Sequence, residues 1–143
     1  MQKLHLTSDW DIERVLHYGA QITSAMKKVI DRFPEDATLD SMAKDILSGA
    51  VQMWLMLDGE EFKGFVLTDV KEVEPTNYKA VRIIALGGDD GVDLCPHIEE
   101  IEKWAWENGA ESVLPVGREG WKKPLSKLGY KIDRIVYRKD KPE

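Results

Sequence analysis

Apolar residues in the first fifty positions recur mostly at helical spacing. Residues 3–7 alternate polar and apolar side chains, which is typical of a short strand. The next segment carries one apolar stripe, which ends at Phe33-Pro34 because proline disfavours helical geometry in the residue before it; its members are Ile12, Val15, Leu16, Ile22, Met26, Val29 and Ile30. The pattern predicts one long helix, in which Gly19 marks a kink or a close contact. It also predicts a second helix over residues 39–47 that ends at Gly49.

The middle of the chain has the pattern of an antiparallel meander. Residues 51–57 are almost continuously apolar, and the Asp58-Gly59 pair that follows favours a tight hairpin turn into a strand over residues 60–73. A turn at residues 75–77 leads to a third strand over residues 78–86. We therefore expect three consecutive strands to pair as neighbours.

The last third combines strands with helices again. A glycine-rich loop over residues 87–91 precedes a helix that begins near Asp93 and ends at Asn108-Gly109. A strand follows over residues 112–116, and then a short helix within residues 118–128. Residues 130–139 are predicted to form the final strand because they carry Ile132, Ile135, Val136 and Tyr137.

The element order is β-α-α-β-β-β-α-β-α-β, which predicts an α+β fold in a single domain over residues 1–143. The 143 residues are 43% hydrophobic, and the net charge of −6 disfavours broad nucleic-acid binding. Cys95 is the only cysteine and forms no internal disulfide, and no signal-peptide pattern or membrane-length apolar run is present. We expect a cytoplasmic protein that does not enter a membrane.

Three features relate the chain to a known family: the order of its elements, its length and the phrase Pro-Leu-Ser-Lys-Leu-Gly-Tyr at residues 124–130. In these features the chain resembles the Gcn5-related N-acetyltransferase (GNAT) family. The resemblance covers nearly the whole chain in element order and about the last forty residues in motif. It implies a three-layer α/β/α architecture with a mixed central sheet, in which an amine attacks acetyl-CoA directly. Small degenerate chains of this kind also resemble proteins encoded by tailed bacteriophages, some of them virion or assembly components, which gives the virion as an alternative location.

In the family, a Gln/Arg-x-x-Gly-x-Gly/Ala loop holds the pyrophosphate of acetyl-CoA through backbone N–H groups at a helix N-terminus. The corresponding segment here, residues 86–93, has the glycines but no Gln or Arg, and its aspartates would repel phosphate; they are Asp89, Asp90 and Asp93. If acetyl-CoA binds, the resemblance implies that Ile84 and Leu86 lie along the pantetheine arm and that Gly87, Gly88 and Gly91 meet the pyrophosphate. Otherwise the segment is a solvated turn capped by Asp93.

The family's usual proton donor is a tyrosine in the last helix, and Leu125 occupies its position here. Leucine cannot donate a proton. Tyr130 matches the final aromatic of the phrase, which is generally a packing residue. Glu72 and Glu74 are candidate bases, although a charged pair at a strand end is commonly just solvated. We assign no catalytic residue.

Cys95 and His97 lie close together but do not form a metal site, because no second Cys/His pair completes a tetrahedron. They also lack a third group to orient them as a nucleophile and base. The aspartate-rich loop does not have the spacing of a calcium loop. We expect no bound metal.

The sequence contains five tryptophans, which is unusual for a chain of this length. Trp104 and Trp106 are two residues apart on one predicted helix, so they cannot both lie on its buried stripe. We expect a partner-binding surface composed of Trp106, Arg118, Trp121 and Lys122, which suits a protein partner or self-association. Alternatively, the rings merely cover sheet edges.

Two functional hypotheses follow. The first is a GNAT-like binding or structural module that has lost its cofactor loop and acid and needs no cofactor. The alternative is an active N-acetyltransferase that uses acetyl-CoA and takes protons from water or substrate. The alternative requires an opening between the fourth and fifth strands, whereas a docking module fills it with side chains.

Overall fold

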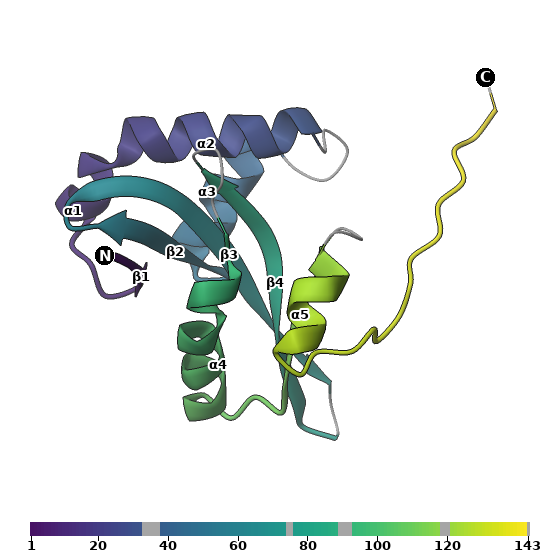
Figure 1. Cartoon of the computed structure of the whole chain (residues 1–143). Helices are drawn as coiled ribbons and strands as arrows, with labels where there is room; N and C mark the ends of the chain where they lie inside the picture. The colour runs from purple at the N-terminus through teal and green to yellow at the C-terminus, as the bar shows by residue number, and fades with distance from the viewer. Residues whose placement is uncertain (33–37, 74–75, 89–92, 118–120, 143) are drawn as a thin grey trace.

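The computed structural model of the chain describes residues 1–32, 38–73, 76–88, 93–117 and 121–142. A curved five-stranded sheet forms its centre, and its strands follow chain order across the sheet (Figure 1). Neighbouring strands are antiparallel except that β5 runs parallel to β4. The strands are β1 (Gln2–Leu6), β2 (Val51–Asp58), β3 (Glu61–Val73), β4 (Tyr78–Gly88) and β5 (Ser112–Pro115).

Helices cover both faces of this sheet, so the predicted α+β architecture with three layers is confirmed (Figure 1). Helices α2 and α3 lie on one face, and α4 and α5 lie on the other. The helical segments are α1 (Ile12–His17), α2 (Gly19–Arg32), α3 (Leu39–Ser48), the 3₁₀ turn η1 (Cys95–His97), α4 (Ile98–Glu107) and α5 (Lys122–Lys127).

Two hydrophobic clusters fill the spaces between the layers. Leu55 faces the α2/α3 side and its neighbour Met56 faces the α4/α5 side, and both are completely buried. Because β2 is covered on both faces, its sequence is a continuous apolar run instead of an alternating one. We call the cluster beneath α4 and α5 the α4-side cluster; its buried members are Leu4, Trp54, Met56, Val66, Val81, Ile83, Leu94, Ile98, Ile101, Ala105, Ala110 and Val113.

The prediction of one continuous helix over residues 12–30 is wrong, because the chain breaks at Tyr18 into α1 and α2. The break lies beside Gly19, where a kink was predicted; the alternative of a close contact is wrong, because a Cβ at Gly19 would meet nothing within 4 Å. Tyr18 is only 2% exposed, and its hydroxyl donates to Glu60 Oε2 at 3.2 Å. Because of the break, the apolar face of α1 does not continue the apolar face of α2. Ile12 and Leu16 consequently lie 58% and 65% exposed instead of in the predicted buried stripe.

The predicted final strand over residues 130–139 is also wrong. Of the residues described, 131–142 have no strand pairing and run away from the sheet as an extended tail (Figure 1). We call residues 131–142 the C-terminal tail. The pattern of this segment suits a strand, but a strand forms only where a neighbouring edge accepts its N–H and C=O groups.

Candidate functional site

The strands β4 and β5 diverge partway along their length. They pair over four positions, from Ala80 opposite Ser112 to Ile83 opposite Pro115. The N–H of Val116 donates to the carbonyl of Ile83 at 2.9 Å, where the pairing ends. Beyond Ile83, β4 continues to Gly88 and is paired with β3 alone among the residues described. A free strand edge over residues 84–88 therefore lies beside the divergence.

A β-bulge stands where this free edge begins. Ile83 lies opposite Thr68 and Ala85 lies opposite Leu67, so Ile84 between them has no register partner on β3. The side chain of Ile84 is 36% exposed, whereas Leu86 is half-buried against the α4-side cluster. The structure thus places both predicted pantetheine positions on the free edge, and the bulge leaves backbone groups of Ile84 outside the ladder.

Gly87 and Gly88 lie at the end of β4 in close contact with β3. A Cβ at Gly87 would approach Phe65 Cε1 to 2.6 Å. One at Gly88 would meet the carbonyl of Lys63, and the φ of 149° at Gly88 already disfavours any side chain there. Sheet packing alone therefore requires both glycines. Gly91, Asp89 and Asp90 lie outside the described residues.

The two residues of the family phrase that bear on proton donation, Leu125 and Tyr130, both pack against the hydrophobic core. Leu125, in the tyrosine position of the family phrase, is half-buried against the α4-side cluster. Tyr130 packs against the same cluster, and its hydroxyl donates to Glu102 Oε2 at 2.6 Å. Burial and this hydrogen bond raise the pKa of Tyr130 far above its usual value, which makes its hydroxyl a poorer acid.

The structure does not bring the candidate base Glu72 to the divergence of β4 and β5. Glu72 is exposed and lies opposite Lys79, four positions along β3 from Thr68. Four strand residues span about 13 Å, so the carboxylate is remote from the free edge. Glu74 lies outside the described residues.

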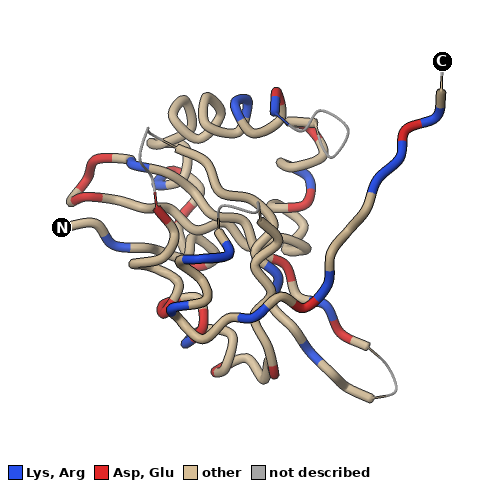
Figure 2. Tube along the Cα trace, turned by 45° about the vertical axis from the view of Figure 1, so that its right-hand side comes forward, with Lys and Arg blue, Asp and Glu red and all other residues tan. Residues whose placement is uncertain are grey.

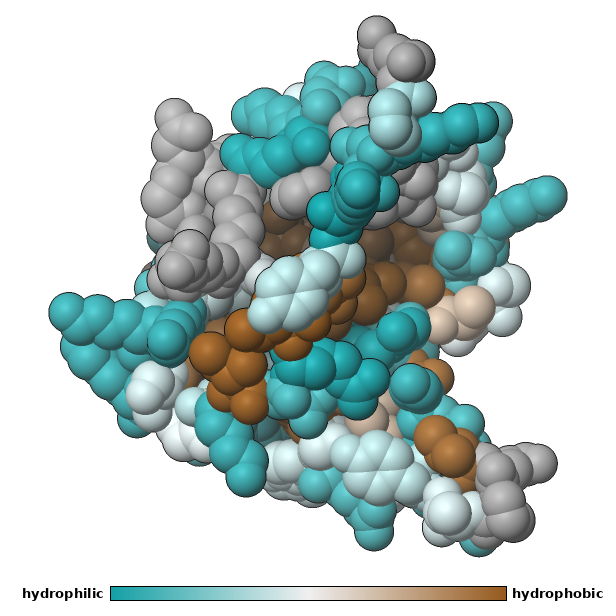
Figure 3. Space-filling view, turned by 90° about the vertical axis from the view of Figure 1, so that its right-hand side faces the viewer, coloured by the Kyte–Doolittle hydropathy of each residue, from teal (hydrophilic) through white to brown (hydrophobic). Residues whose placement is uncertain are grey.

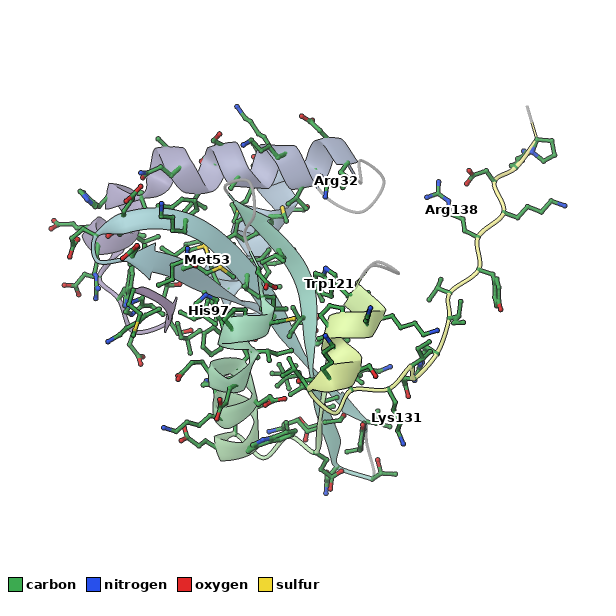
Figure 4. All side chains as sticks on the ribbon, viewed as in Figure 1. Arg32, Met53, His97, Trp121, Lys131 and Arg138 are labelled. Carbon is green, nitrogen blue, oxygen red and sulfur yellow. The ribbon has the colours of Figure 1, made fainter. Side chains whose placement is uncertain are left out.

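The tryptophans differ in exposure, as the sequence requires for Trp104 and Trp106. Trp106 is 51% exposed, whereas Trp104 is half-buried and packs edge-to-face on Trp54 with ring centroids 5.6 Å apart. Trp121 lies between β4 and α5 (Figure 4), half-buried against the α4-side cluster, with its ring over the Cα of Gly117. Of the other predicted partner-binding residues, Lys122 is exposed and Arg118 lies outside the described residues.

The surroundings of Cys95 and His97 fit a structural role and not a catalytic or metal-binding one. The N–H of Cys95 donates to Asp93 Oδ1 at 3.0 Å, but the prediction that Asp93 is the N-cap is wrong, because Leu94 precedes η1 and His97 precedes α4. Burial, assisted by Asp93, raises the pKa of the Cys95 thiol and makes it a weaker nucleophile. Among the described residues, no group of three or more His, Cys, Asp and Glu side chains is arranged to hold a metal ion. No helix within the described ranges is long and apolar enough to cross a membrane.

A buried polar chain at the bulge was missed by the sequence reasoning. The indole N–H of Trp54 donates to Thr68 Oγ1 at 3.0 Å, and the Thr68 hydroxyl donates to Gln52 Oε1 at 3.0 Å. Gln52 and Trp54 are two apart on a strand and so share a face, which is a visible signal. The position of Thr68 depends on the register of β2 and β3, which the pattern alone does not give.

No protein-family model and no curated protein matches the sequence. The fold, however, matches solved acetyltransferases over nearly their whole length. An aminoglycoside acetyltransferase from an uncultured soil metagenomic sample, solved in complex with sisomicin, has a TM-score of 0.68 at 12% identity, covering 99% of this chain and 97% of that one. Glucosamine-6-phosphate N-acetyltransferase from Arabidopsis thaliana has a TM-score of 0.66 at 12% identity and 98% coverage of both chains.

A third similar structure is a predicted acetyltransferase from Clostridium acetobutylicum, solved with acetyl-CoA. It has a TM-score of 0.65 at 10% identity and covers 97% of this chain and 96% of that one. At such identities the likeness concerns the arrangement of the backbone. The chain has the fold of the GNAT acetyltransferases, as the order of its elements and its Leu-Gly-Tyr phrase imply.

Proposed function

We propose that the chain binds the pantetheine arm of an acyl-CoA along the free edge of β4 and transfers the acyl group to an amine. The observation that carries this proposal is the divergence of β4 and β5 after Ile83, together with the bulge at Ile84. Pantetheine contains two amide groups, which can pair with strand backbone as another strand would. The fold supports the proposal because similar solved structures are acetyltransferases, one of them solved with acetyl-CoA.

In the proposed reaction the amine nitrogen attacks the thioester carbonyl carbon, so that a C–N bond forms and the C–S bond breaks. The amine loses a proton to solvent and the departing thiolate takes one from water. This route agrees with Leu125, which has no proton to give, and with the raised pKa of Tyr130. The contribution of the protein is then to position the thioester beside the amine.

The test is calorimetric titration of acetyl-CoA and CoA into wild type, Ile84→Pro and Ile84→Val. Proline removes the N–H of Ile84 without removing a register pair with β3, and bulges tolerate proline. We expect micromolar binding to wild type and to Ile84→Val, and a loss of at least about tenfold in Ile84→Pro. Thiol release from acetyl-CoA with a panel of amines then tests transfer. No binding by folded wild type at millimolar CoA would overturn the proposal.

A second candidate is a non-catalytic binding or structural module, such as a virion or assembly component. The observation that favours it is that Leu125 completes an apolar cluster where the family phrase has its tyrosine, while Trp106 is 51% exposed on α4. Such a module gives no heat with CoA and no thiol release. The same titration therefore separates the two candidates.

A further inference from the structure

The C-terminal part of the chain carries a charge opposite to that of the rest. Residues 121–142, which comprise Trp121, α5, the turn after it and the C-terminal tail, contain eight basic and two acidic side chains, a net charge of +6. Because the whole chain has a net charge of −6, the remainder has a net charge of −12. We call residues 121–142 the basic segment. A negatively charged surface attracts the chain through this segment and repels the rest of it.

The basic side chains of this segment are directed into solvent. All eight are exposed, and Figure 2 shows Lys and Arg recurring along the tail toward the C-terminus. In α5, Leu125 packs against the α4-side cluster, so the three lysines of this helix are left on its outer side. Lys131 and Arg138 lie farther along, on the part of the tail that leads away from the sheet (Figure 4). The positive charge is therefore available to a partner along the whole segment.

Apolar side chains are interleaved with these charges and also lie in water. Figure 3, which views the side of the molecule on which the tail lies, shows a band of apolar side chains between hydrophilic ones. Leaving such side chains in water forfeits the gain from burial, so a partner that covers them is favoured. They are 47% to 87% exposed: Leu128, Ile132, Ile135, Val136 and Tyr137.

A combination of basic, aliphatic and tyrosine side chains fits the surface of an anionic membrane. Lys and Arg reach lipid headgroups with their charged ends while aliphatic side chains enter the boundary of the acyl chains. Tyrosine favours the membrane–water interface, and Tyr137 directly precedes Arg138 and Lys139. Nucleic-acid bases, in contrast, stack on aromatic rings, and Tyr137 is the only aromatic residue in the sequence of the tail. Aliphatic side chains gain from a bilayer and not from bases.

We propose that the basic segment binds the surface of an anionic phospholipid membrane, with its lysines and arginines at the headgroups and its aliphatic side chains in the outer acyl region. A segment bound in this way lies in the interface and does not span the bilayer. Tyr130, whose hydroxyl donates to Glu102 on α4 at 2.6 Å, joins the segment to the folded body. The body, with its charge of −12, stays on the water side of the segment. The inference does not depend on acyl transfer.

The test is flotation of the full chain with vesicles of phosphatidylcholine containing about 30% phosphatidylserine, and with vesicles of phosphatidylcholine alone. Two double variants each remove one component of the surface. Lys122→Glu with Lys123→Glu reverses charge in the first turn of α5, where acidic residues favour a helix. Ile135→Ser with Val136→Ser keeps the charge and removes apolar side chains that are 62% and 84% exposed, so the folded body is undisturbed.

The matched control is Lys27→Glu with Lys28→Glu, which changes the net charge equally at exposed positions of α2. We expect wild type to float with the anionic vesicles and not with the neutral ones, and to be released at about 0.5 M salt. Each of the two test variants should lower the partition constant at least about tenfold. The control should stay within about threefold of wild type, because salt screens charges that lie away from the contact.

Several results would overturn the proposal. One is folded wild type that does not float with anionic vesicles, as when the tail is covered by its own body. Another is equal binding to neutral and anionic vesicles. A loss in the lysine variant that the serine variant does not share would mean that no side chain enters the bilayer. Finally, a single-stranded oligonucleotide bound more tightly than the vesicles, and equally by the serine variant, would assign the basic segment to nucleic acid.

Discussion

Tyr130 Oη donates a 2.6 Å hydrogen bond to Glu102 Oε2 and so ties the chain just beyond α5 to α4. Gly129 before it has a φ of 91°, which ends α5, and the N–H of Tyr130 returns to the carbonyl of Leu125 at 3.1 Å. The half-buried ring packs against the α4-side cluster. The Leu-Gly-Tyr phrase therefore works as a helix end and an anchor, and its residue types need no catalytic explanation.

Replacing Tyr130 by phenylalanine should lower stability and leave any acyl transfer unchanged. The variant keeps the ring but loses a hydrogen bond to a charged group, which contributes about 1.5–3 kcal/mol. Urea unfolding of Tyr130→Phe, Glu102→Gln and the double variant measures the coupling. A variant with unchanged stability but a large loss of thiol release would instead make Tyr130 the proton donor.

The Thr68 hydroxyl is the link on which the polar chain at the bulge depends. Thr68→Val should destabilise the protein by about 1–3 kcal/mol, because the buried indole N–H of Trp54 loses its acceptor. Thr68→Ser is the matched control: it keeps the hydroxyl and loses about 1 kcal/mol of methyl burial. Urea unfolding followed by tryptophan fluorescence measures both. Equal losses in the two variants would contradict a role for the hydroxyl.

The elements that the sequence predicted correctly depend on local signals. The apolar run of β2 and the hairpin turn after it are contiguous in the chain. The turn itself lies one residue later than predicted, at Gly59 and Glu60, because Asp58 still pairs with Glu61; Gly59 has a φ of 62°. Gly49, at φ 85°, ends α3 for the same conformational reason. The helix stripe of α4 is likewise local, with Ile98, Ile101 and Ala105 buried as predicted.

The two wrong predictions of whole elements are the continuous first helix and the final strand. Both depend on contacts with residues that are distant in the sequence. Tyr18 breaks the first helix because it is buried in the hydrophobic cluster on the α2/α3 side of the sheet, where its hydroxyl reaches Glu60, forty-two residues away. The C-terminal tail has strand composition, but pairing needs an edge that its own sequence does not specify. At the candidate site, periodicity placed Ile84 and Leu86 on β4, whereas the bulge and the divergence from β5 follow from register.

Gly88 should tolerate substitution poorly whether or not a cofactor binds there. Gly88→Ala places a Cβ against the carbonyl of Lys63 at a φ of 149°, and should destabilise the chain by more than about 1 kcal/mol. Gly19→Ala is the control, because a Cβ there meets nothing within 4 Å and alanine favours a helix by up to about 1 kcal/mol. Thermal unfolding compares them. A Gly88→Ala variant as stable as wild type would show that β3 and β4 separate easily at this end.

His97 makes stability depend on pH in the mildly acidic range. It is 7% exposed, and its Nε2 lies 3.4 Å from Gln2 Oε1. Burial lowers the pKa of His97, and the nearby charges of Asp93 and Glu100 oppose this only in part. Burial, together with Arg14 and Lys3, lowers the pKa of His5 as well. The folded protein therefore keeps both rings neutral at pH values where the unfolded chain, with a histidine pKa of about 6.5, takes up protons.

Because the unfolded state binds more protons, the stabilisation from a neutral His97 is complete above about pH 6.5 and is lost as the pH falls toward its folded pKa. Urea unfolding of wild type and His97→Gln between pH 5 and 7.5 tests this sign. Wild type should lose stability on acidification, and His97→Gln should lose less over the same interval, with the remaining slope including His5. A wild-type stability that rises toward pH 5, or equal slopes in the two proteins, would mean that the folded structure accommodates a charged ring at position 97.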